Sequence, residues 1–221
     1  SVGIANSTST ATVAETVVVT AGSVSVAAEN TNDFKTSTLA DTKRPTPNFG
    51  QAIGFTFAGY DSSATAMLGG TITAETGNVD VSADSVFVTN MAKTLTKVRE
   101  EDTIGEKVKG KIGDKVGITL KKTAGEAKAD QGYGAFSSRC AFTVALSDSR
   151  AESSIAAGAD ITSAGAVSVD AYAEDNARLQ AVSIADIQTK TSFSGAVLVA
   201  DYESDASAFV RQGTPITLAG H

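Results

Sequence analysis

The sequence is poor in the residues that build most active sites. Its 221 residues include one cysteine, one histidine and no tryptophan. Cys140 has no partner for an intrachain disulfide, so we expect burial to supply the stability. The histidine is the final residue, His221. A Ser-His-Asp triad, a histidine-ligated metal and a zinc finger are therefore disfavoured, and we expect no catalysis, no metal and no cofactor.

Leucine, positive charge and long apolar runs are also scarce. The chain has 8 Leu against 32 Val and Ile, which argues against a helical bundle and for strands. Its formal net charge of -7 disfavours non-specific binding of nucleic acid, which needs clustered cations. No apolar run approaches the roughly 20 residues of a membrane-spanning helix, so we expect no membrane-spanning segment. Small residues dominate instead: Ala, Thr, Ser and Gly make up 106 of 221.

A long repeat organises these small residues. Four threonines, Thr20, Thr73, Thr162 and Thr217, anchor similar segments at spacings of 53, 89 and 55 residues. The matching segments are residues 19–28, 72–83, 161–171 and 216–220. A second element, rich in phenylalanine, recurs at 49–58, 136–145 and 193–200. Self-similarity at such a period is the signature of a repeat architecture.

The longer middle interval indicates an insertion at 99–135. This segment holds 8 of the 18 Lys and Arg, together with 7 acids and 7 Gly. We expect a loop or hairpin that protrudes from the array. It is a candidate for partner binding, because binding residues often lie on loops carried by a rigid scaffold. Its candidate partner-binding residues are Lys107, Lys109, Lys111, Lys115 and Tyr133. The expected organisation is one continuous domain, with repeats at 1–98 and 136–221 on either side of the insertion.

Alternating residues inside each repeat predict strands with one buried face. Val24, Val26 and Ala28 are expected to point inward, and the Gly-containing stretches before them to form turns. A 54-residue unit contains about four such stretches, which suggests three coils of ~18 residues. Together these features predict an all-β parallel β-helix. A string of sandwich domains is the alternative, but those run near ~100 residues each.

The repeated units resemble a known family. Residues 161–169, together with the stretches 4–13 and 27–34, are similar to filamentous-haemagglutinin-like adhesins and related autotransporter passengers. The resemblance covers the chain outside 99–135. It implies a right-handed parallel β-helix, export to the bacterial cell surface or beyond, and a role as a non-catalytic stalk, filament or adhesin. It brings no catalytic residues. The partner stays open between a glycan, a host or cell-surface protein, end-to-end self-association and none.

Two other functions were weighed against the stalk. A carbohydrate-processing or carbohydrate-binding β-helix would use acids such as Asp80 and Asp170, which we expect at equivalent positions three coils apart. That separation, ~14 Å at roughly 4.8 Å per coil, is too long for a glycosidase carboxylate pair. An ice-binding array of Thr would need a continuous column, but the column of Thr12 continues as Met67, Ser154 and Phe209.

Three further expectations concern single residues and the ends of the array. Cys140 aligns with Ile53, which predicts an inward-facing, unreactive thiol. Tyr60, Phe209 and Tyr133 are candidate exposed aromatics. The chain starts and stops inside repeats, so we expect terminal coils with unpaired strands, and an array that continues or packs end to end.

Overall fold

The protein is a parallel β-solenoid built from eleven described strands and no described helix. The computed structural model describes residues 1–43, 49–99, 136–183 and 192–219. The strands are β1 (Val2–Val13), β2 (Val18–Ala21), β3 (Val24–Lys43), β4 (Phe49–Leu68), β5 (Thr71–Ala74), β6 (Val79–Arg99), β7 (Phe136–Ile155), β8 (Asp160–Ser163), β9 (Val167–Ser183), β10 (Ser192–Val210) and β11 (Ile216–Leu218).

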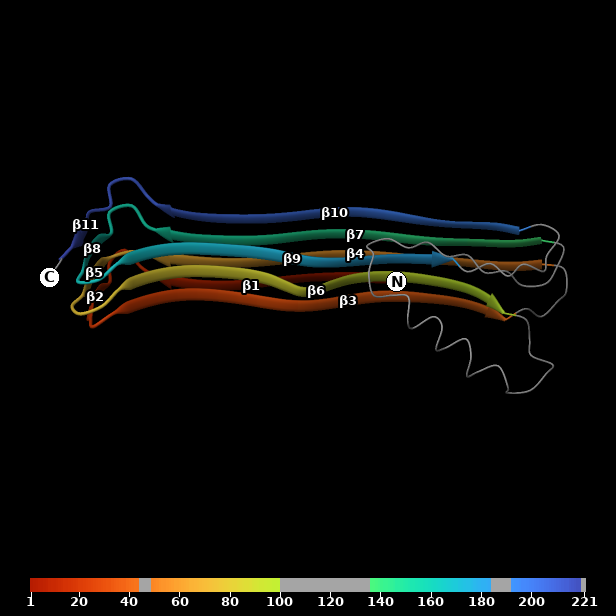
Figure 1. Cartoon of the computed structure of the whole chain (residues 1–221), viewed down its shortest axis with the longest axis horizontal. Helices are drawn as coiled ribbons and strands as arrows, with labels where there is room; N and C mark the ends of the chain where they lie inside the picture. The colour runs from red at the N-terminus through yellow and green to blue at the C-terminus, as the bar shows by residue number, and fades with distance from the viewer. Residues whose placement is uncertain (44–48, 100–135, 184–191, 220–221) are drawn as a thin grey trace.

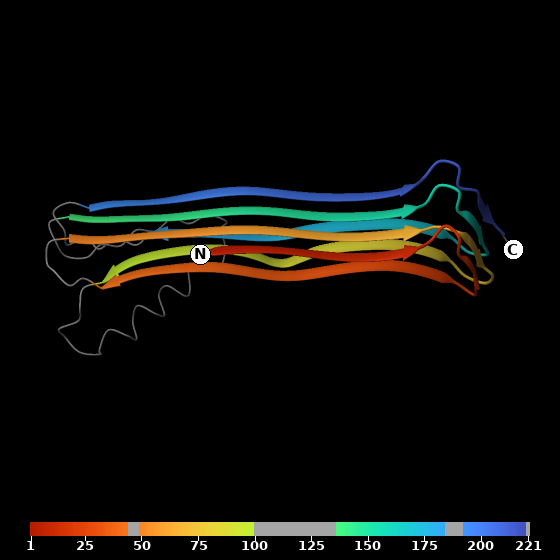
Figure 2. The ribbon, with the colours of Figure 1, turned by 180° about the vertical axis from the view of Figure 1, so that it is seen from behind.

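These strands form three parallel sheets that share one repeating path. Sheet A has the order β1-β4-β7-β10, sheet B the order β11-β8-β5-β2, and sheet C the order β3-β6-β9. In each coil a long strand of sheet A runs to one end of the molecule, a short strand of sheet B turns the corner, and a long strand of sheet C returns (Figure 1). Sheets A and C therefore lie face to face along an elongated body (Figure 2). A twenty-residue strand spans about 65 Å at roughly 3.3 Å per residue.

Each repeat is a single large coil, so the predicted division into three coils of ~18 residues is wrong. Val24 pairs with Val79 and Val18 pairs with Thr71, offsets of 55 and 53 residues. The predicted anchors are confirmed, because Thr20 pairs with Thr73 and the same column continues through Thr162 to Thr217. The column Thr12–Met67–Ser154–Phe209 is likewise as expected.

The additional residues of the middle interval lie between two strands of adjacent coils. β6 ends at Arg99 and β7 begins at Phe136, whereas the corresponding links of the other coils are residues 44–48 and 184–191. The register between β4 and β7 accordingly grows to 87 residues, with Phe49 opposite Phe136. The predicted partner-binding residues Lys107, Lys109, Lys111, Lys115 and Tyr133 lie outside the described residues.

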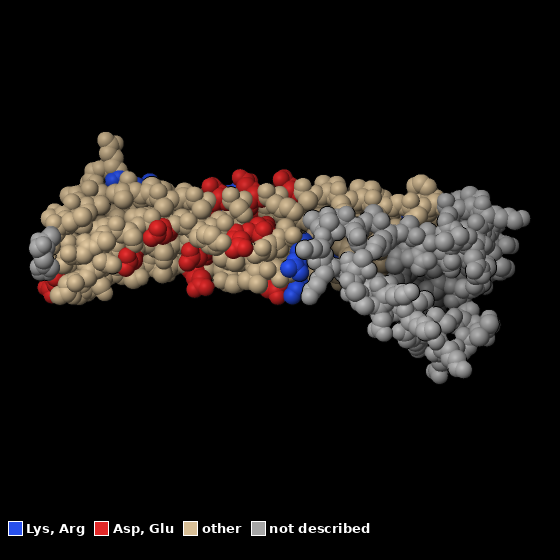
Figure 3. Space-filling model, viewed as in Figure 1, with Lys and Arg blue, Asp and Glu red and all other residues tan. Residues whose placement is uncertain are grey.

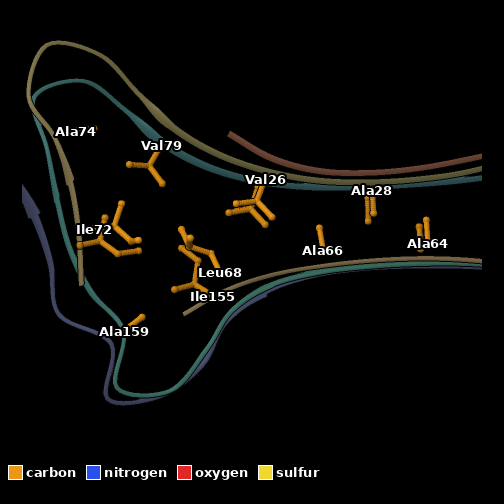
Figure 4. Packing of buried hydrophobic residues seen from close by; sticks show 14 residues of the cluster. Val26, Ala28, Ala64, Ala66, Leu68, Ile72, Ala74, Val79, Ile155 and Ala159 are labelled. Carbon is orange, nitrogen blue, oxygen red and sulfur yellow. The ribbon is translucent and has the colours of Figure 1, made fainter. Parts of the chain in front are cut away.

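Aliphatic side chains fill the solenoid where sheet B closes it. Ile72, Ile161, Leu68 and Ile155 are fully buried there, and valines and alanines of sheets A and C complete the cluster (Figure 4). The predicted inward columns are confirmed: Val79 is fully buried and Val24 packs against the same cluster. At roughly 25 cal/mol per Å² of apolar surface, this end supplies much of the hydrophobic stabilisation.

Farther from sheet B, the interior between sheets A and C contains hydrogen-bonded hydroxyl groups. Thr38 and Thr94 of sheet C alternate with Thr56 and Thr143 of sheet A in one chain of contacts. The Oγ1–Oγ1 distances are 2.7 Å for Thr56–Thr38, 2.7 Å for Thr94–Thr56 and 2.9 Å for Thr143–Thr94. Each hydroxyl also donates to or contacts a backbone carbonyl, at 2.7 to 3.1 Å. Buried polar groups are tolerated when they are hydrogen-bonded, so these threonines join the two sheets instead of weakening the interior.

Candidate binding face

Large apolar side chains cover the outer face of sheet A at the end away from sheet B. Phe55, Phe142 and Val197 lie side by side on β4, β7 and β10. The next outward row, two residues on, holds Val2, Phe57, Val144 and Val199. Val199 is 50% exposed, and Ile53, in the row before Phe55, is 59% exposed.

The narrow interior explains why these side chains point outward. An added Cβ at Gly54, which faces inward on β4, would lie 2.6 Å from Thr94 Cγ2 and 2.7 Å from Thr96 Cγ2 on the opposite sheet. Only small residues fit at that separation, so the phenylalanines between them alternate to the solvent side. Three rows on three or four strands make a patch of roughly 300 Å² at the usual strand spacings. A patch of that size matches the largest apolar patch on a typical monomer surface, which is often functional.

Cys140 belongs to this outer face, so its predicted inward orientation is wrong. It pairs with Ile53 as expected, but that column faces solvent. The thiol is free and partly exposed. On its other side it pairs with Gly195, which has no side chain to cover it. The error arose because apolar neighbours were taken to mark the core, which the close approach of the two sheets forbids here.

A row of acids borders the apolar patch. The row crosses all four strands of sheet A and consists of Asn6 followed by the three acids Asp61, Asp148 and Glu203. Like charges on neighbouring strands repel. Arg150 offsets this repulsion: its Nε donates to Asp148 Oδ1 at 2.9 Å, and the guanidinium forms an ion pair with the same carboxylate. The hydrogen bond and charge of Asp148 raise the pKa of Arg150, with smaller contributions from Glu203 and Asp61.

A hollow of about 420 Å³ lies between the apolar patch and the acids. It forms where Gly59 interrupts the outward side chains between Ile4 of β1 and Leu146 of β7. The other lining residues are Ala5, Asn6, Tyr60, Asp61, Ser147, Asp148, Asp201 and Glu203. Its chemistry is therefore mixed, with aliphatic groups on one side and carboxylates on the other, and sequence reasoning missed it because Gly59 falls outside the repeat anchors.

Other expected site residues are placed elsewhere. Tyr60, predicted to be exposed, is only 5% exposed and stacks on Phe34 with ring centroids 5.0 Å apart. Asp80 and Asp170 do not occupy equivalent positions, because Asp80 pairs with Ser168 and Asp170 with Ser82. They lie on adjacent coils, two residues out of register, and Ser168 donates a hydrogen bond of 2.6 Å to Asp80. The expected pair of equivalent acids three coils apart is therefore wrong.

The described residues hold no group of three or more His, Cys, Asp or Glu side chains that could bind a metal ion. Within the same ranges, no helix is long and apolar enough to cross a membrane. Acidic side chains are spread along the rod on the face in Figure 3 and outnumber the Lys and Arg visible among the described residues. No protein-family model, curated protein or solved structure matches the chain.

Proposed function

We propose that this chain is a non-catalytic stalk segment of a large exported bacterial surface protein, and that it carries an adhesive face. The observation that carries the proposal is the exposed apolar patch of sheet A on a long, hydrogen-bonded scaffold. Three continuous parallel sheets suit a rigid scaffold, because each coil is held to its neighbours by backbone hydrogen bonds along its strands. The resemblance to filamentous-haemagglutinin-like adhesins supports an extracellular or cell-surface location.

Partner binding is proposed for the outer face of sheet A and for the insertion at 99–135. A host or cell-surface protein fits the patch, because phenylalanine anchors surrounded by polar residues are typical of protein interfaces. End-to-end contact between copies is a further proposal, because the outermost strand of each sheet has one unpaired edge among the described residues.

The test uses beads coated with the protein and layered on cultured epithelial cells. Replacing Phe55 and Val199 together by Ser should reduce retention at least tenfold, whereas Leu39→Ser, at an even more exposed apolar residue on sheet C, should not. Replacing 100–135 by the five-residue link of 44–48 measures the contribution of the insertion. Beads coated with the unaltered protein that are retained no better than albumin-coated beads would refute the adhesive role.

Carbohydrate binding is the second candidate, favoured by the hollow at Gly59. Carboxylates beside an aliphatic surface can hydrogen-bond sugar hydroxyls while the sugar ring rests on the apolar side. Gly59→Val would fill the hollow without backbone strain, because Gly59 has no positive φ. Loss of binding on a glycan array in this variant, with Thr65→Val as the matched outer-face control, would support the role. An unaltered protein that binds no glycan would exclude it.

A further inference from the structure

The outer face of sheet A is strongly unbalanced in charge. Its strands β1, β4, β7 and β10 contain two cationic side chains, Arg139 and Arg150, of which Arg139 is fully buried. The same strands contain six acids, and each of them lies on an outward column: Asp61, Asp148, Glu152, Asp201, Glu203 and Asp205. This face therefore carries one guanidinium against six carboxylates.

These acids gather around the hollow at Gly59. Asp61, Asp148, Asp201 and Glu203 line it, and no Lys or Arg of the described residues does. Asp61, Asp148 and Glu203 share one row, on neighbouring strands about 4.8 Å apart. Asp201 lies in the row before them, beside Leu146. Four negative charges thus border a space of about 420 Å³.

Arg150 offsets only part of this charge. Its Nε donates to Asp148 Oδ1 at 2.9 Å, and its side chain is 59% exposed. The hydrogen bond and charge of Asp148 raise the pKa of Arg150, and the charges of Glu203 and Asp61 raise it further. The carboxylates therefore stabilise a cation at this place. Asp61, Asp201 and Glu203 are exposed, so a second cation can approach them from solvent.

Aliphatic side chains flank the same hollow. Ile4 is 77% exposed and Leu146 is 41% exposed, on the strands to either side of Gly59. Their row adjoins the apolar patch at Val2 and Val144. The aliphatic stem of a lysine or arginine lies favourably along such side chains while its charged head stays beside carboxylates.

Charge separates the possible occupants of the hollow. Carboxylates on neighbouring strands repel one another, and a cation between them relieves that repulsion. A neutral sugar can accept or donate hydrogen bonds there, but it leaves the repulsion in place. An anionic glycan or an anionic lipid surface adds to it. The combination of carboxylates and apolar surface therefore favours a basic and apolar partner.

We propose that the outer face of sheet A docks a protein segment that presents a lysine or arginine side chain next to large apolar residues. The cationic head lies in the hollow between Asp61 and Glu203, where its hydrogen bonds are charge-assisted. Its stem lies against Ile4 and Leu146, and the apolar residues beside it cover the patch. This inference rests on the adhesive role proposed above and names the chemistry of the partner.

Three fluorescein-labelled decapeptides are the probes. Each alternates threonine with phenylalanine or valine over six residues, and then carries two lysines, two glutamates or two glucosylated serines at alternate positions. Anisotropy is measured as the full 221-residue chain is added. We expect the lysine peptide to bind at least tenfold more tightly than the other two. Raising the salt from about 0.1 M to about 1 M should narrow this difference, because the screening length falls from about 10 Å to about 3 Å.

Two double variants test the location. Asp61→Asn combined with Glu203→Gln removes two charges beside the hollow at nearly constant shape. Both residues are exposed, so the far-UV spectrum and melting temperature should not change. Asp84→Asn combined with Asp170→Asn makes the same change in net charge on the outer face of sheet C and is the matched control. We expect the first double variant to weaken the lysine peptide at least tenfold, and the second to weaken it less than twofold.

The competing outcomes are distinct. The proposal is overturned if the lysine peptide does not bind, if the three peptides bind equally, or if neutralising Asp61 and Glu203 leaves lysine-peptide binding unchanged. Tightest binding of the glucosylated peptide would assign the hollow to carbohydrate and would also overturn it. The cell-retention assay fails separately: beads that are retained while the three peptides bind equally would leave an adhesive face without a basic partner.

Discussion

Gly54 shows at the scale of one residue how closely sheets A and C approach. Its hydrogen faces Thr94 and Thr96 across the interior, and a methyl group would come within 2.6 Å and 2.7 Å of their Cγ2 atoms. Gly54→Ala should therefore destabilise the protein by about 1–3 kcal/mol, the usual penalty of overpacking. Gly195→Ala is the matched control, because its added Cβ would meet only the Phe193 ring at 3.9 Å. Denaturant unfolding measures both, and equal stabilities would show that the sheets can separate freely.

The thiol of Cys140 gives a second test of which face is outside. Its column faces solvent, and Gly195 leaves it uncovered on one side. We therefore expect a small thiol reagent to label the native protein at conditions where its unfolding is negligible. Cys140→Ser should change the free energy of unfolding by less than about 0.5 kcal/mol, as for other surface changes. Labelling that occurs only on addition of denaturant would contradict the outward orientation.

Individual strands were predictable from the sequence to different degrees. The inward columns of β3, β6 and β9 follow from their alternating Val and Ala, and the structure confirms that Val79 and Val81 are fully buried. The length of the coil did not follow, because strands continue through polar residues such as Asn30, whose side-chain amide donates to the carbonyls of Ser7 and Ser63 inside the solenoid. Alternation records which face a residue occupies, but not where the chain turns.

The orientation of the phenylalanine-rich element was predicted wrongly for a related reason. Apolar neighbours alone assigned Cys140 to the core, whereas the space between the sheets is set by residues on the opposite strand. The hollow at Gly59 also depends on neighbouring coils, so no single strand sequence contains it. Local pattern thus predicted the sheets, and the contacts between sheets decided the candidate site.

The short strands of sheet B differ in stability according to their place in the stack. Ile161 of β8 is fully buried between coils, and Ile216 of β11 occupies the same column at the edge, where it is 39% exposed. Ile161→Ala should cost about 2–5 kcal/mol, the range for truncating a buried aliphatic side chain. Ile216→Ala should cost about 1 kcal/mol or less, because much of its surface already contacts water. Urea unfolding of the two variants checks this, and similar losses would mean that β11 is covered in solution.

At the scale of the whole molecule, the solenoid should fold without the insertion. All eleven described strands, and the contacts between them, lie outside residues 100–135. The equivalent link between β3 and β4 is residues 44–48, so the sequence Arg-Pro-Thr-Pro-Asn can replace 100–135 directly. Each halving of a loop lowers the entropy cost of closing it by roughly 0.6 kcal/mol, and this replacement amounts to about three halvings. The free energy of unfolding should therefore stay unchanged or rise by up to about 2 kcal/mol.

Circular dichroism and thermal melting of the shortened chain test this separation of scaffold and insertion. We expect the same far-UV β-spectrum, and a melting temperature that is equal or higher by a few degrees, since 1 kcal/mol shifts a domain of this size by about 2–4 °C. A chain of equal length, in which 100–135 is replaced by a Gly-Ser linker, controls for loop length alone. If both replacements abolished the β-spectrum, the side chains of 100–135 would be part of the folding core and not a separable insertion. If only the short link did so, the junction between Arg99 and Phe136 would require a longer path than the one that joins β3 to β4.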